Sequence, residues 1–318
     1  MLPEARVPSW WMSRPPVAVG RVRPRAAVGA LGVLWRFSRP HTLIGTSLSI
    51  VSLYAIAASV GRASDAADLV LTLLAGACVN VFIVGINQLE DVEIDRLNKP
   101  WLPIAAGELS LDGARRIVVV AAVAPLAMAV TQGARELIAV TVALAIGWAY
   151  SCPPLRVKRY PALAAGSITF VRSLVVNLGV WVHVAGTPIE AGVWALLAVT
   201  VPFSFAIAVL KDVPDIEGDR RYGIATFSVR LGPRPVLAVG VAALTAAGAG
   251  MAIAGPLLLH HADPIVLATG HVVGLAALWR WALRVDPADP VAFAGFYQRV
   301  WQLFFAEYLL VAAAYVVA

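Results

Sequence analysis

Residues 191–219 read AGVWALLAVTVPFSFAIAVLKDVPDIEGD, an uncharged stretch that runs directly into a short acidic segment. Its first part, residues 191–210, matches the roughly 20 apolar residues that an α-helix needs to cross the hydrocarbon of a bilayer. Charged residues begin only where this part ends. We therefore expect a membrane-spanning helix that brings a group of carboxylates to one membrane surface.

The rest of the chain repeats this pattern. Of its 318 residues, 60% are hydrophobic and only 14% are charged, and the mean hydropathy is +0.79. A soluble α/β protein would show short apolar strands between polar turns instead of these long runs. We expect an all-α polytopic membrane protein, with about nine transmembrane helices around a central cavity and cytoplasmic helix-loop caps. The expected spans are residues 41–60, 68–90, 113–131, 134–150, 161–184, 191–210, 235–256, 264–283 and 299–317.

Basic residues are distributed unevenly among the connections between these spans. When alternate connections are compared, one side of the membrane holds only Arg62 and Arg135, while the other holds nearly all remaining Lys and Arg residues. Because basic residues concentrate on the cytoplasmic side, we expect a cytoplasmic N-terminus and an outer C-terminus. We interpret residues 1–34 as a basic cytoplasmic tail and residues 35–318 as a single transmembrane domain. The expected location is a bacterial plasma membrane.

The charge and the cysteines argue against several other classes of protein. The net charge of +6 does not indicate a nucleic-acid partner, because the basic residues lie between apolar segments and not in one soluble patch. Cys78 and Cys152 stand far apart, so we expect neither a disulfide framework nor a cysteine metal site. The basic tail lacks the short apolar core of a cleavable signal peptide, and we expect none.

Two long cytoplasmic connections, residues 91–112 and 211–234, carry clusters of carboxylates. At the start of the first, Asn87, Asp91 and Asp95 follow one another at intervals of four residues. Steps of four drift by only about 40° around a helix, so these side chains would line one face. Both connections follow an even-numbered span, which suggests a weak internal repeat of helix, acidic loop and helix.

The second connection contains Asp212, Asp215 and Asp219, which also share a face at helical spacing. Clustered carboxylates at the ends of membrane helices repel one another and lose hydration, which is costly unless a cation compensates them. Mg²⁺ suits such a site, because it takes oxygen ligands and bridges a few carboxylates to substrate phosphates. The sequence therefore predicts a diphosphate held by magnesium between the two connections. The alternative is that these residues are solvated surface acids and helix caps.

Both segments resemble the signatures of a known family. Residues 87–107, NQLEDVEIDRLNKPWLPIAAG, resemble the first signature of the UbiA superfamily of intramembrane prenyltransferases, and specifically of its homogentisate prenyltransferase branch. Residues 211–232, KDVPDIEGDRRYGIATFSVRLG, are similar to the second signature of that branch. Further segments resemble the same family, namely RPHT at 39–42, YSCPPLRVKR at 150–159 and VRSLVVNLG at 171–179.

The resemblance implies a reaction and a set of site residues. The reaction is the transfer of a prenyl group from a prenyl diphosphate to an aromatic acceptor, either homogentisate or another hydroxylated aromatic acid, through an allylic carbocation. It requires Mg²⁺, with two ions expected, and belongs to the biosynthesis of isoprenoid quinones, tocopherol-like compounds or meroterpenoids. The implied catalytic and metal-binding residues are Asn87, Asp91, Asp95, Asp215 and Asp219. The implied substrate-binding residues include Arg39, Tyr150, Ser151, Arg156, Lys158, Lys211 and Asp212.

Two polar residues lie within an expected span. Arg172 and Asn177 are buried in hydrocarbon by this assignment, and polar groups at such depth usually face the bundle interior and serve a site, so we expect both to bind substrate. The alternative for them is an interhelical hydrogen bond. Ser173 stands where the resemblance implies glycine, which leaves the helix packing around Arg172 open. For Arg156 and Lys158, and likewise for Lys211 and Arg39, the alternative is that they only set membrane topology.

Two other functions remain as alternatives. A membrane terpene cyclase of the same superfamily would ionise the same donor and form a product without any acceptor. A cation-coupled transporter would normally place its acidic groups near the bilayer midplane on broken helices, whereas these groups lie in loops on one side. The prenyl chain length, the acceptor ring, its decarboxylation and the oligomeric state cannot be predicted from the sequence.

Overall fold

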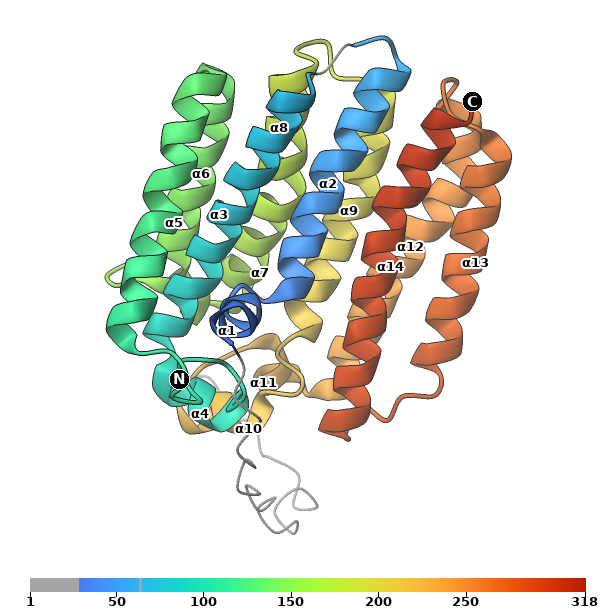
Figure 1. Ribbon diagram of the computed structural model, residues 1–318. Coiled ribbons are helices and arrows are strands. Elements are labelled where there is room, and N and C mark those ends of the chain that lie inside the picture. The colour runs from blue at the N-terminus through green and yellow to red at the C-terminus, as the bar shows by residue number, and fades with distance from the viewer. Residues whose placement is uncertain (1–28, 63–64) are drawn as a thin grey trace.

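The computed structural model describes residues 29–62 and 65–318, and every regular element within these ranges is helical (Figure 1). The helices are of two kinds. Short helices lie at the mouth of a cavity, and long helices form its walls. The short elements are α1 (Ala30–Phe37), α4 (Val92–Asn98), η2 (Val157–Arg159), α10 (Ile216–Arg221) and α11 (Phe227–Leu231). The long elements are α2 (Pro40–Ser59), α3 (Ala66–Glu90), α5 (Leu111–Gln132), α6 (Ala134–Ser151), α9 (Ala191–Leu210), α12 (Pro233–Leu258), α13 (Pro264–Ala282) and α14 (Pro290–Val316). A further long element is the composite of α7 (Pro161–Thr169), η3 (Phe170–Val175) and α8 (Val176–Val184).

Within the described ranges, nine helices are long and apolar enough to cross a membrane, which confirms the predicted fold class. Eight of them begin and end within about two residues of the predicted spans. The last differs, because α14 begins at Pro290 and not near residue 299. The Asp289 side chain accepts hydrogen bonds from the amides of Val291 and Ala292, so the helix starts well before the apolar run that marks it in the sequence.

The predicted tail falls almost entirely outside the described residues. Of residues 1–34, the structure describes only the last six, and most of these form the start of α1. The side chains of Asn80 and Gln88 on α3 hold the corner between α1 and α2, where they donate to the carbonyls of Ser38 at 3.0 Å and Phe37 at 2.8 Å. This corner thereby fixes the position of the residue that follows it, Arg39.

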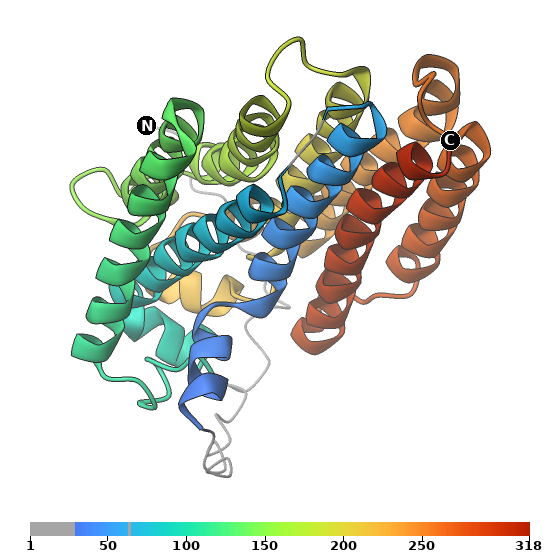
Figure 2. The same cartoon turned by 45° about the horizontal axis from the view of Figure 1, so that its top comes forward.

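The short helices gather at one end of the bundle. Figure 1 shows α1, α4, α10 and α11 at this end, and the C-terminus at the opposite end. Figure 2 shows α1 in blue and α4 in teal at the lower end of the long helices. α4 and α10 lie against each other, each directly after a long helix, α3 and α9 respectively. This agrees with the weak helix–loop–helix repeat suggested by the sequence.

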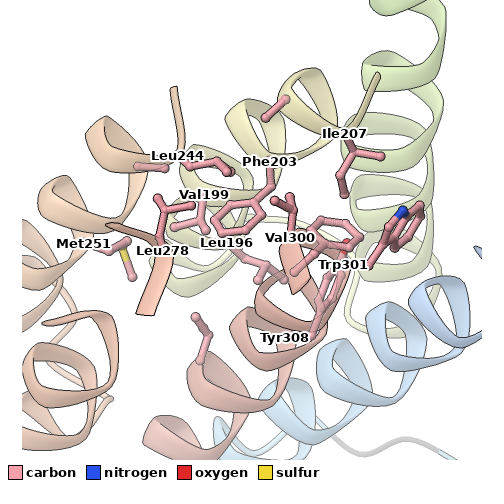
Figure 3. Close-up of a cluster of buried hydrophobic side chains, with 14 of the residues drawn as sticks. Leu196, Val199, Phe203, Ile207, Leu244, Met251, Leu278, Val300, Trp301 and Tyr308 are labelled. Carbon is pink, nitrogen blue, oxygen red and sulfur yellow. The ribbon is translucent and has the colours of Figure 1, made fainter. Parts of the chain in front are cut away.

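α9 forms the centre of the packing, because it is the most buried of the spans. Its Phe203 and Ile207 meet side chains of α12, α13 and α14, including Leu244, Leu278 and Trp301 (Figure 3). The spans at the periphery instead expose apolar side chains. Lipid tails, and not water, are the solvent for these outer faces.

The span from Pro161 to Val184 is not a regular α-helix. Its middle six residues, Phe170–Val175, form a π-helix, and such bulges concentrate at functional sites. Ser173 lies inside this bulge, fully buried, and its hydroxyl lies 2.8 Å from Ser204 Oγ and donates to the Thr200 carbonyl at 2.7 Å. Serine in place of the expected glycine therefore ties the bulge to α9.

Candidate active site

The first acidic cluster lies where α3 gives way to α4. The sequence predicted one continuous helical face, but α3 ends at Glu90, and Asp91 departs from helical geometry before α4 begins. Helical hydrogen bonding resumes at once, since the Asp95 amide donates to the Asp91 carbonyl at 2.8 Å. Asn87 Nδ2 also donates to Asp91 Oδ2 at 3.1 Å. Asn87, Asp91 and Asp95 therefore still line one cavity.

The second acidic cluster is not on one continuous helix either. The chain turns between α9 and α10, where Pro214 lacks the backbone N–H that an uninterrupted helix would need. The predicted shared face of Asp212, Asp215 and Asp219 is therefore wrong in detail, because Asp212 lies in the turn and only Asp219 lies within α10. The turn nevertheless brings all three side chains to the cavity that the first cluster lines.

Direct contacts join the two clusters. Lys99, at the end of α4, forms an ion pair with Asp215. Asn98 Nδ2 donates to Asp219 Oδ1 at 3.2 Å. A Cβ atom on Gly218 would overlap the Asn98 side chain, so only glycine at this position of α10 admits the contact. The acidic connections thus form one structure and not two independent loops.

The connection after α6 adds cations to the first cluster. Lys158 Nζ donates to Asp91 Oδ2 at 2.6 Å, and an Arg156 Nη donates to Asp91 Oδ1 at 3.1 Å. Lys158 lines the cavity, whereas Arg156 contacts Asp91 from outside it. Ser151 is fully buried, with its hydroxyl 3.5 Å from Asn87 Nδ2, and it too does not line the cavity. The structure therefore gives Arg156 and Ser151 contacts to the aspartate cluster and not to the cavity.

Burial changes the acidity of two carboxyls in the clusters. Loss of hydration raises the pKa of Asp95 to about 6, although Arg39 nearby acts in the opposite direction. Loss of hydration also raises the pKa of Asp219 to about 7, and the negative charges of Asp212 and Asp215 raise it further. Both carboxyls thus lie in surroundings with too little positive charge to compensate them.

The basic residues of the mouth lie in two different environments. Burial lowers the pKa of Lys158, even though Asp91 favours its charged form. Burial acts in the same direction on Lys211, but the neighbouring Asp212 outweighs it, so the pKa of Lys211 lies well above its usual value. Lys211 Nζ contacts Asp212 Oδ1 at 2.8 Å and the Tyr150 hydroxyl at 3.5 Å. Lys211 is therefore a fixed positive charge between the acidic mouth and Tyr150.

The donor set suits a hard divalent cation that is shared with a phosphate. The side chains of both clusters offer oxygen ligands, and Asp95 Oδ2 is buried without a hydrogen-bond partner in the described part of the chain. Across residues 29–62 and 65–318, no three His, Cys, Asp or Glu side chains stand close enough to hold a metal by themselves. Mg²⁺ commonly takes one or two carboxylates and completes its coordination with substrate phosphates and water.

Behind this mouth, the cavity extends into the bundle with a volume of about 500 Å³. One part of it reaches Arg172, whose guanidinium lies 4.7 Å from the centre of the Trp301 ring. His41 packs edge-on against the same ring, with centroids 4.9 Å apart, and Tyr297 lines the wall beside it. Arg172 Nη1 is buried and has no hydrogen-bond partner among the residues that the structure describes. The Arg172 guanidinium therefore presents to the cavity a charged hydrogen-bond donor that has no acceptor among the described residues.

Asn177 does not share this position. It is fully buried, and Ser49 Oγ donates to its Oδ1 at 2.9 Å while its Nδ2 donates to the Ser173 carbonyl at 2.7 Å. It is absent from the cavity lining. These contacts match the alternative considered for Asn177 from the sequence, an interhelical hydrogen bond, and not substrate binding.

The structure also adds residues that sequence reasoning did not select. Asn98 and Lys99 both line the cavity. From the sequence alone, Lys99 is only one of the basic residues that indicate topology, and Asn98 is not singled out. Both lie within the first signature, just after its acidic positions, and this proximity was the available signal. Tyr297 and Trp301 carried no signal, because aromatic residues in a membrane span are ordinary.

The fold and the mouth of the cavity define an intramembrane enzyme that joins a charged site to an apolar interior. The sequence model of the UbiA prenyltransferase family matches residues 48–306, and the chain belongs to this family. Homogentisate phytyltransferase of Synechocystis sp. is 41% identical over 89% of this chain and 95% of its own length. Homogentisate geranylgeranyltransferase of Triticum aestivum is 36% identical over 88% of this chain and 72% of its own length.

A solved structure agrees with the fold. The UbiA homologue from Archaeoglobus fulgidus bound to GPP and Mg²⁺ superposes with a TM-score of 0.60 at 21% identity, over 88% of this chain and 99% of its own. Family membership confirms the predicted class of enzyme, a membrane-embedded prenyltransferase.

Proposed function

We propose that this chain transfers a prenyl group from a prenyl diphosphate to a ring carbon of homogentisate or a similar hydroxylated aromatic acid. The main observation behind this proposal is that one cavity contains both a charged site and an apolar site. An acidic mouth lined with cations opens directly onto an apolar interior, and beside that interior lies the Arg172 guanidinium, whose Nη1 has no hydrogen-bond partner in the described ranges. The names of the relatives from Synechocystis and wheat support homogentisate as the acceptor.

The mouth would hold the diphosphate of the donor. Asn87, Asp91 and Asp95 from one side and Asp215 and Asp219 from the other would bind two Mg²⁺ ions. These ions would neutralise charge on the diphosphate as it leaves. Lys158 and Lys211, with Arg39 at the corner before α2, line the same mouth and supply further positive charge. Arg156 contacts Asp91, and Asp212 contacts Lys211. Through these contacts, both residues help to orient the positively charged side chains of the mouth.

The acceptor would lie near Arg172. A carboxylate on the acceptor needs a cationic partner inside the bundle, and Arg172 presents a buried Nη1 without a partner in the described ranges. The π-helix places this residue about 16 Å from the start of its span, counted along the helix. His41, Tyr297 and Trp301 surround the position with aromatic rings, which suit the face of an aromatic acceptor.

The reaction proceeds in three steps. The bond between the allylic carbon and the diphosphate oxygen breaks, and the oxygen keeps the electron pair under the influence of the cations at the mouth. The carbocation remains in the apolar interior, away from bulk water, until a ring carbon donates its electrons to form the new carbon–carbon bond. The ring then regains aromaticity by losing a proton to water or to the released diphosphate. In the decarboxylating variant, the carboxymethyl substituent loses CO₂, the electrons of that C–C bond neutralise the ring cation as an exocyclic methylene, and the ring proton moves to this carbon to give a methyl group.

Arg172, whose Nη1 lacks a hydrogen-bond partner among the residues that the structure describes, favours this reaction over both alternatives. A terpene cyclase folds a hydrocarbon cation onto itself and has no anionic partner for a guanidinium at this depth. A transporter would place its acidic groups at the midplane, whereas both clusters here lie at one end of the bundle. We also infer that this end faces the cytoplasm of a bacterial plasma membrane, because the Lys and Arg residues concentrate there.

The test uses the purified chain in lipid nanodiscs with Mg²⁺ and geranylgeranyl diphosphate. The donor is supplied alone, with homogentisate or with 4-hydroxybenzoate, and products are identified by mass. We expect a prenylated ring only when an aromatic acid is present. A hydrocarbon or prenyl alcohol formed equally well without acceptor would support the cyclase, and an intact donor in every reaction would contradict both enzymes.

A further inference from the structure

The cavity does not end at the reaction site but continues along α3 and α6 toward the opposite end of the bundle. Asn87 lines its mouth, and Thr72, on the same helix, lines its far end. At a rise of about 1.5 Å per residue, these two positions on α3 lie about 22 Å apart. The far end also meets Glu136, which lies in the first turn of α6.

The walls between these ends are mostly apolar. Most side chains that α2, α3, α6 and the composite span place along this stretch are apolar and suit a hydrocarbon chain, although Thr46, Asn80 and Arg172 also line the cavity. The lining includes Ile50, Val79, Ile83, Val140, Ala143 and Val180.

The far end itself is polar and incompletely satisfied. Glu136 is 4% exposed, and its Oε2 atom is buried without a hydrogen-bond partner in the described ranges. Gln132 Nε2 donates to Thr72 Oγ1 at 2.9 Å and to Asp68 Oδ1 at 3.0 Å, while Gln132 Oε1 has no partner there. Behind this layer, Asp68 accepts a bond from the Tyr54 hydroxyl at 2.8 Å. Hydrogen bonds thus fix these side chains on the side away from the channel. Glu136 Oε2 and Gln132 Oε1 remain without a partner in the described ranges.

We propose that Glu136 and Thr72, with Gln132 hydrogen-bonded behind Thr72, form a polar floor that limits the length of the prenyl chain to about four isoprenoid units. The inference rests on the proposed function, because it assigns the apolar channel to the donor chain. An isoprenoid unit adds four chain bonds of about 1.5 Å and therefore extends roughly 5 Å. About four units fill the distance from the mouth to Thr72.

The floor disfavours a longer chain for an energetic reason as well as a steric one. A fifth unit would have to displace the Glu136 side chain, which lines the far end and whose Oε2 has no hydrogen-bond partner in the described ranges, and would leave it against hydrocarbon. Covering one such buried polar atom costs enough to lower the specificity constant by about tenfold or more. A chain of about four units ends just before this layer and avoids the penalty.

The test compares donors of increasing length within each variant. We measure kcat/KM for farnesyl, geranylgeranyl and geranylfarnesyl diphosphate with homogentisate, and use ratios between donors because they do not depend on the amount of folded protein. In Glu136→Ala, the ratio of geranylfarnesyl to geranylgeranyl diphosphate should rise by about tenfold or more. Glu136→Gln keeps the size and polarity of the side chain and should retain the wild-type ratio.

A second variant acts in the opposite direction. Ala139 lines the channel one turn closer to the mouth than Glu136, so Ala139→Leu should shorten the channel and lower the ratio of geranylgeranyl to farnesyl diphosphate. Ile138→Ala changes an α6 side chain that is 64% exposed and lies outside the cavity lining, and serves as the matched control, with an unchanged ratio. Unchanged ratios in both Glu136→Ala and Ala139→Leu would overturn the floor, and if Glu136→Ala does not accumulate, Ala139→Leu decides. A wild-type enzyme that consumes no donor would instead contradict the proposed function.

Discussion

At the scale of single residues, Asp91 has the most connections of any aspartate at the mouth. It receives hydrogen bonds from Asn87, Arg156 and Lys158, and it ends α3. Two segments that are distant in the sequence, the end of α3 and the η2 connection, therefore meet at one carboxylate. Asp215 has a similar position on the other side, through its ion pair with Lys99.

We expect Asp91→Asn and Asp215→Asn each to lower kcat by about a hundredfold or more, because each removes a negative oxygen ligand while keeping the side-chain shape. Turnover and thermal unfolding are measured on the same preparations. Asp112→Asn is the matched control, since Asp112 is an exposed acid at the same end of the bundle and pairs only with Arg115. Retention of more than about a tenth of wild-type activity in either variant would count against the two-cluster site.

Arg172 permits a prediction that separates acceptor from donor. We expect Arg172→Leu to raise the apparent KM for homogentisate by at least about tenfold while changing the KM for the donor much less, because one charged hydrogen bond to the acceptor is lost. Arg172→Lys should restore part of the affinity. The reverse pattern, with donor binding weakened and acceptor binding intact, would show that the two ends of the pocket are assigned the wrong way round.

At the scale of elements, α4 and α10 act together as the lid of the acidic mouth. Their contact depends on one glycine, since the Asn98 side chain occupies the space that a Cβ atom on Gly218 would need. Asn98 can move aside only by losing its hydrogen bond to Asp219.

We therefore expect Gly218→Ala to raise the KM for the donor several-fold, with little change in thermal stability because the displaced atoms belong to a flexible side chain. Gly250→Ala is the control, as nothing lies near a Cβ atom at that position of α12. The mechanism is tested by a double-mutant cycle. In an Asn98→Ala background, Gly218→Ala should cost almost nothing further, and equal costs in both backgrounds would contradict the proposed role of the glycine.

The buried carboxyls on α4 and α10 also allow a prediction of how the protein responds to metal removal. Burial without sufficient positive charge raises the pKa values of Asp95 and Asp219, so a bound cation should stabilise this region. We expect EDTA to abolish turnover and Mg²⁺ to restore it, with Mn²⁺ as a weaker substitute. Mg²⁺ together with inorganic diphosphate should also raise the Tm of the wild type but not of Asp91→Asn. Full turnover in excess chelator would disprove metal dependence.

At the scale of the whole molecule, the sequence was informative wherever structure follows from local composition. The spans could be predicted because crossing hydrocarbon requires about 20 apolar residues in a row. The acidic residues could be located because carboxylates next to such spans are unusual. The pairing of Lys99 with Asp215 and the π-helix around Arg172 could not be predicted, and for Asn177 the sequence could not decide between substrate binding and an interhelical hydrogen bond. Each of these depends on side chains from other helices, and no local pattern encodes them.

The orientation of the whole bundle gives the last prediction. The described chain places α1, α4 and α10 at one end and the C-terminus at the other, as an odd number of crossings requires. The excess of Lys and Arg at the α4 end predicts that this end faces the cytoplasm. In a background with Cys78→Ala and Cys152→Ala, we expect Arg96→Cys on the exposed side of α4 to react with a membrane-impermeant maleimide only in inverted vesicles. His261→Cys, exposed at the opposite end, should react only in intact cells. Labelling of Arg96→Cys from outside intact cells would reverse the topology and place the diphosphate site beyond the reach of cytoplasmic substrates.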